Sequence, residues 1–101
     1  MNITYGSIEF PRHVGSGPQT LEKDVDIQVK ISNAVAVLTG HTLAFADRYD
    51  HNFGGAIVQV SCKRNPDANS VKVTATLGLR DWSGNWDDAY FGEVSFAVIS
   101  E

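Results

Sequence analysis

A strict alternation of apolar and polar residues between positions 71 and 79 constrains the fold more than any other feature. The apolar positions of this run are Val71, Val73, Ala75, Leu77 and Leu79, with Lys72, Thr74, Thr76 and Gly78 between them. Successive side chains of a β-strand point to opposite faces, so a period of two predicts a strand with one buried face. Shorter runs with this period recur along the chain, and no stretch sustains a helical period.

Six strands are expected from these runs. The predicted strands cover residues 3–10, 23–31, 34–38 with a short continuation at 41–46, 56–63, 71–79 and 91–100. The last of them is expected to place Val94, Phe96 and Val98 inward. Turn-forming residues separate them, and Pro11 is expected to end the first strand because proline cannot donate to a ladder. The spacing predicts an all-β fold, a six-stranded antiparallel β-sandwich. A length of 101 residues suits one domain covering residues 1–101.

Two of the predicted strands differ in whether one or both of their faces are apolar. Residues 23–31 place Val25, Ile27, Val29 and Ile31 on one face and polar side chains on the other, as expected of a half-buried strand. Residues 34–38 are apolar at every position, which is typical of a strand covered on both faces. In a chain of this size, a neighbouring subunit could supply the second cover.

The charge balance narrows the classes of partner. The net charge is -4, and the eight Lys and Arg residues are scattered, so we expect no binding to nucleic acid or to anionic membranes. We expect no membrane insertion, because the sequence has no long apolar run, and no secretory signal is recognisable. A cytoplasmic location, or export without an N-terminal signal, is expected. Cys62 lies in an alternating run and is interpreted as a buried, inert thiol.

The stretch from Arg80 to Tyr90 is the best candidate for a binding site. It contains both tryptophans of the chain and one tyrosine, interleaved with acids and amides: Asp81, Trp82, Asn85, Trp86, Asp87, Asp88 and Tyr90. Sugar rings stack their C–H faces on aromatic rings, and their hydroxyls need carboxylate or amide partners. The stretch therefore predicts a loop that binds a carbohydrate. The alternative is that a tryptophan caps the core while the acids are only solvated.

Metal and catalytic chemistry are less well supported. Asp81, Asp87 and Asp88 with Asn85, or Asp47, Asp50 and Asn52, could offer oxygens to calcium, but neither set completes the twelve-residue calcium loop. We therefore expect no cofactor, with calcium as the alternative. The three histidines lack zinc-ligand spacing. A small sandwich has little room for the enclosed pocket that a catalytic carboxyl needs, so we expect no enzyme.

The order of elements from about residue 22 to 100 resembles the H-type lectin domain, the sugar-binding module of snail agglutinins and discoidins. Family members place a Trp at the end of the penultimate strand, then a short polar loop and an aromatic residue before the closing strand, and Trp82 and Tyr90 match these positions. The resemblance implies a sandwich that forms parallel trimers with sugar sites between neighbours. Residues 56–59 lack the Arg with which family members commonly hold the sugar. Any second half of the site is therefore expected from the loop 47–52 or from a neighbouring subunit.

These observations lead to one expected function and one rival. The first is a glycan-binding, lectin-like module without catalysis that acts as a homotrimer or hexamer. Its expected site residues are Asp81, Trp82, Asn85, Trp86 and Tyr90. The rival is a structural trimerisation or receptor-contact domain of a larger assembly, without a sugar site.

Overall fold

A computed structural model describes residues 1–13, 17–46, 52–67, 69–86 and 88–101. Within these ranges the chain forms six strands and two three-stranded sheets. The strands are β1 (Asn2–His13), β2 (Gln19–Asp26), β3 (Ala34–Phe45), β4 (Phe53–Arg64), β5 (Ser70–Asp81) and β6 (Tyr90–Ser100). All hydrogen-bonded strand pairs are antiparallel, which confirms the predicted six-stranded antiparallel β-sandwich. The described residues include no helix that is long and apolar enough to cross a membrane.

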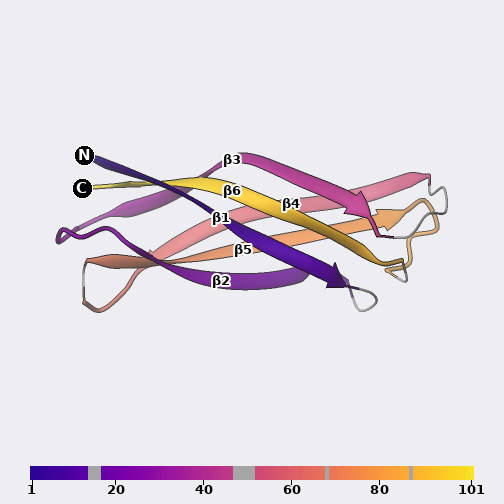
Figure 1. Cartoon of the computed structure of the whole chain (residues 1–101), viewed down its shortest axis with the longest axis horizontal. Helices are drawn as coiled ribbons and strands as arrows, with labels where there is room; N and C mark the ends of the chain where they lie inside the picture. Colours follow the sequence, from indigo (N-terminus) through magenta and orange to yellow (C-terminus); the bar gives the residue numbers. More distant parts are fainter. Residues whose placement is uncertain (14–16, 47–51, 68, 87) are drawn as a thin grey trace.

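Successive strands alternate between the two sheets except β4 and β5, which pair with each other within one sheet. Sheet A has the order β1-β6-β3, and sheet B has the order β2-β5-β4. Each strand runs opposite to the one before it, so both termini lie at one end of the elongated molecule (Figure 1). Strands β1, β3 and β5 end, and β2, β4 and β6 begin, at the opposite end, which we call the loop end.

The core lies between the sheets and is centred on β5 and β6. Val94, Phe96 and Val98 of β6 are fully buried, as their alternation predicted. The facing residues of β5, Val71 to Leu77 at every second position, are also fully buried. Each central strand has a neighbour on both sides, so its inward side chains are covered from all directions. Cys62 is half-buried against this core from edge strand β4.

The predicted strand at residues 23–31 is wrong in its bounds. Strand β2 ends at Asp26, whose carboxylate accepts a hydrogen bond of 2.8 Å from the backbone N–H of Gln28. Gln28 has a φ of 67°, a left-handed conformation that turns the chain out of the sheet. Val29 is consequently 46% exposed, whereas its expected companions Val25, Ile27 and Ile31 are buried.

Strands β4 and β5 extend beyond their predicted bounds by one to three residues at each end, and β1 and β3 differ more. Strand β1 continues past Pro11 to His13, with a register shift between Phe10 and His13. Proline is tolerated there because β1 is an edge strand and the pairing is already irregular. Strand β3 joins the two predicted segments at 34–38 and 41–46 through a register shift between Leu38 and Gly40. A bulge at Thr39-Gly40 thus connects residues 34–38 with their predicted continuation in one strand.

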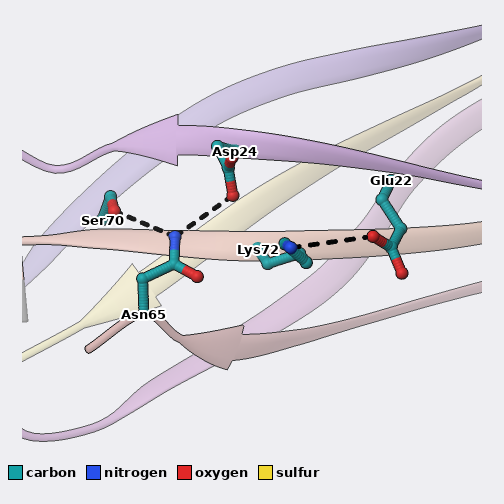
Figure 2. Close-up of polar contacts among 5 residues, drawn as sticks. All are labelled: Glu22, Asp24, Asn65, Ser70 and Lys72. Atoms are coloured by element: carbon teal, nitrogen blue, oxygen red, sulfur yellow. Dashed lines mark hydrogen bonds and ion pairs between the residues drawn. The ribbon is translucent and has the colours of Figure 1, made fainter. Parts of the chain in front are cut away.

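The outer face of sheet B is polar. Figure 2 shows the Asn65 amide donating to Asp24 at 3.1 Å and to the Ser70 hydroxyl at 2.9 Å. The Lys72 ammonium lies 3.8 Å from the Glu22 carboxylate on the same face (Figure 2). Both partners of this ion pair are about half exposed, so it contributes little to stability. Sheet B therefore has the wet outer face expected of an antiparallel sheet.

Sheet A differs at the end where the termini lie. Its outward positions there are all apolar, and we call this surface the apolar half-face: Ile3, Tyr5, Val35, Val37, Ala97 and Ile99. Val35 is 53% exposed and Tyr5 is 75% exposed. The residues that looked apolar on both sides in the sequence thus place Ala34 and Ala36 toward the core and the valines outward.

Candidate functional site

Trp82 lies at the loop end, directly after β5. Its side chain is 72% exposed, an unusual position for the residue type that buries the largest area. Its backbone is fixed, because the Trp82 N–H donates to the Asn52 carbonyl at 2.9 Å and extends the β4–β5 pairing beyond the end of the ladder. The exposed indole ring is therefore attached to a backbone that this hydrogen bond fixes in place.

The residues after Trp82 form a tight, self-bonded turn. The Asp81 carboxylate accepts hydrogen bonds from the Ser83 N–H at 2.9 Å and from the Ser83 hydroxyl. That hydroxyl oxygen accepts the Asn85 N–H at 3.3 Å. Gly84 turns the chain with a φ of 83°. Asp81 was expected to bond a sugar hydroxyl, and in the structure one of its oxygens holds the turn.

Two glycines of β4 let this turn sit close to the sheet. A Cβ at Gly54 would overlap the carbonyl oxygen of Asp81, and a register shift occurs at this point of the β4–β5 pair. A Cβ at Gly55 would lie 3.2 Å from the Arg80 guanidinium. The Gly54-Gly55 pair thus leaves room for both the backbone of Asp81 and the side chain of Arg80.

Trp86 has a different environment from Trp82. It is half-buried, and its Cζ3 lies 3.0 Å from where a Cβ on Gly78 would be. Pro18 contacts the same glycine from the β1–β2 connection. The Arg80 guanidinium carbon lies 5.9 Å from the centroid of the Trp86 ring, within the range of a cation–π contact. Trp86 therefore packs on the outer side of sheet B, and part of its ring stays accessible.

Tyr90 does not lie beside the tryptophans on the surface. Its side chain is fully buried, and its hydroxyl donates toward the carbonyls of Gly17 at 3.1 Å and Leu77 at 3.3 Å. The His13 ring meets it edge-on with centroids 5.8 Å apart. Burial raises the pKa of the Tyr90 phenol, because the charged phenolate loses solvation. The expected role of Tyr90 as a wall of the sugar site does not fit this position, and Tyr90 instead closes the core at the loop end.

The remaining expected residues are only partly placed. Asn85 is exposed beside Trp82 and Trp86 on the same connection. Asp87 and residues 47–51 lie outside the described residues, so the second half of the site expected from 47–52 is represented only by Asn52. Among the residues that the structure describes, no three His, Cys, Asp or Glu side chains gather as a metal site would require.

A second candidate surface was missed by the sequence analysis. A recess of about 550 Å³ lies on the outer face of sheet A toward the loop end, with Glu9, Arg12, Thr42, Phe91 and Glu93 among its lining residues. Glu9 and Glu93 face each other directly across the β1–β6 pair. Alternation in β1 and β6 indicates that both glutamates point outward, but only the strand register brings them together.

Comparisons with known proteins found no match for this chain. No protein-family model matches the sequence, no curated protein matches it, and no solved structure matches the fold.

Proposed function

We propose that this chain is a carbohydrate-binding module without catalytic activity, which acts as a homotrimer or hexamer. The observation that carries the proposal is the 72% exposed Trp82 ring on a backbone that is bonded to Asn52. An exposed tryptophan on a rigid base suits stacking against the C–H face of a sugar ring, since little order has to be gained on binding.

Polar groups around Trp82 support the same ligand class. Ser83 and Asn85 are exposed on the turn that follows Trp82, and both side chains can exchange hydrogen bonds with hydroxyl groups. The half-buried Trp86, with Arg80 over its ring, extends this surface along the same connection. We assign the sugar contacts to Trp82, Trp86 and Asn85, with Asp81 as the residue that positions the turn.

Repetition of the site would compensate for a shallow surface. A site formed by one exposed loop buries little of a ligand, so the affinity of a single copy is expected to be weak. Linking several copies raises the effective concentration of the second binding event without any new contact. The resemblance to the H-type lectin domain supports an assembly of this kind.

A structural or receptor-contact domain is the second candidate, and the apolar half-face of sheet A favours it. Exposed apolar patches of this kind are typical of protein–protein contacts. In that reading Trp82 serves a partner protein and not a glycan.

A glycan array followed by calorimetry separates the two candidates. We expect binding by the wild-type protein and a loss of at least about tenfold in affinity in Trp82→Ala, which removes the stacking ring. Phe91→Ala is the matched control, because it removes an exposed ring from the recess on sheet A. A failure to bind any glycan would favour the structural candidate, and loss in Phe91→Ala alone would move the site to the recess.

A further inference from the structure

We propose that the apolar half-face of sheet A is the surface through which this chain binds a second copy of itself. The inference rests on the self-association in the proposed function but not on its sugar binding. It assigns that association to the face formed by the first residues of β1 and β3 and the last residues of β6.

A comparison of the two sheets identifies the half-face as exceptional. All six of its outward positions are apolar. The four on the outer strands β1 and β3 are exposed, with Ile3 at 51%, Tyr5 at 75%, Val35 at 53% and Val37 at 39%, whereas on the central strand β6 Ile99 is half-buried and Ala97 is buried between its neighbours. The outward positions of sheet B, by register, are polar along the same length: Thr20, Glu22, Asp24, Gln59, Ser61, Lys63, Lys72, Thr74 and Thr76. An outer face that meets only water is expected to resemble that of sheet B.

The half-face is also a regular and pre-formed surface. The pairing of β1 with β6 is unbroken from Asn2 to Phe10, and the pairing of β3 with β6 is unbroken from Ala34 to Leu38. Both register shifts of sheet A fall beyond this region. Association through an ordered sheet costs little conformational entropy, which favours binding by such a surface.

The isolated chain exposes more surface than a compact monomer of its mass. Its accessible surface is 6145 Å², whereas a monomer of 11.0 kDa is expected to expose about 5,600 Å². Its radius of gyration is 15.5 Å, against about 13 Å for a compact domain of this length. The excess of roughly 500 Å² reflects this elongated shape. Burial of about that area on each copy would form an interface of about 1,000 Å², near the lower limit for specific association.

The chemistry of the half-face points to a second copy as the partner. An uncharged apolar patch is complementary to the same patch on other copies, so copies related by a symmetry axis can pack these patches against one another. Interfaces between identical subunits are also the more apolar class. Farther along the same face, Glu9 and Glu93 lie opposite each other on β1 and β6. Stacking these acidic rows of two copies would bring like charges together, so the contact is confined to the apolar half.

Light scattering on the intact protein, measured over a dilution series, tests the inference. The variant Ile3→Lys/Val35→Lys places two charges on exposed positions of the half-face, where core packing is not disturbed. Ser61→Lys adds a lysine to an exposed position of edge strand β4 in sheet B and serves as the matched control. Far-UV circular dichroism checks that each variant keeps its strand content, and Tyr5→Ser replaces the double variant if that one unfolds.

We expect the wild type and Ser61→Lys to be oligomers. At concentrations where the wild type is assembled, the half-face variant should have the monomer mass of about 11.0 kDa. Its dissociation constant should rise at least about tenfold. An oligomer that persists in the half-face variants would overturn the inference and leave the proposed function intact. A monomeric wild type would overturn both the inference and the homo-oligomer, while the glycan array would still judge sugar binding separately.

Discussion

The ring of Trp86 occupies the space that a side chain on Gly78 would need. An added Cβ at Gly78 would lie 3.0 Å from Cζ3 of Trp86 and 2.9 Å from Cβ of Pro18. Gly78 is outward-facing on the central strand of sheet B, so the missing side chain creates a slot between two connections that are far apart in sequence. Packing of Trp86 in this slot holds the middle of the β5–β6 connection against the sheet.

Substitution of Gly78 by alanine is expected to displace Trp86. Overpacking at such a contact costs about 1–3 kcal/mol in the free energy of unfolding. Urea denaturation measures this loss, and iodide quenching of the tryptophan fluorescence should increase as Trp86 moves outward. Gly40→Ala is the control, since a Cβ there meets nothing within 4 Å. Equal stability of the two variants would contradict the role of the slot.

Removal of the Tyr90 hydroxyl is expected to weaken the fold without affecting glycan binding. Tyr90→Phe keeps the buried ring but loses the hydrogen bonds to the carbonyls of Gly17 and Leu77. The free energy of unfolding should fall by about 1 kcal/mol. Tyr5→Phe, at a 75% exposed position, should change it by less than about 0.5 kcal/mol. A loss of glycan affinity in Tyr90→Phe at unchanged stability would return Tyr90 to the binding site.

Stability is expected to fall at alkaline pH through the buried Tyr90 and the half-buried Cys62. Burial raises the pKa of Tyr90 above its ordinary value of 10.0 and that of the Cys62 thiol above 9.0. A raised pKa means that the folded state holds the proton more tightly than the unfolded state does. The resulting stabilisation is complete below the unfolded-state pKa and is lost as pH rises through the folded-state pKa.

The measurement is urea denaturation at pH values from about 8 to 11. The free energy of unfolding of the wild type should decline more steeply above about pH 9 than that of Tyr90→Phe/Cys62→Ala, which lacks both groups. The other titrating residues are common to both proteins, so the difference between the two curves isolates these two. Parallel curves would show that neither group is linked to folding.

The sequence was sufficient for the fold class because the alternation in β5 is strict and the inward positions of β6 are all apolar. Val94, Phe96 and Val98 were expected to be inward, and all three are fully buried. The end of β2 was not predictable in the same way, since residues 23–31 keep the alternation while Gln28 adopts a positive φ. That conformation is stabilised by a side chain of Asp26, which a pattern of hydrophobicity does not record.

The candidate site was only partly predictable. Both tryptophans lie on one connection as expected, but their different exposure depends on Gly78 and Pro18, which are distant in sequence. Tyr90 could have been placed, because it shares the parity of the inward residues Val94 and Phe96. The prediction began the last strand at Phe91 and so read Tyr90 as part of the loop.

The central claim is that a glycan covers the exposed ring of Trp82. Iodide quenching of the Trp86→Phe variant tests it most directly, because Trp82 is then the only tryptophan of the chain. The ring is 72% exposed, so we expect strong quenching in the free protein and clear protection when an array-selected glycan is bound at saturation. Quenching that is unchanged by the bound glycan would contradict the account.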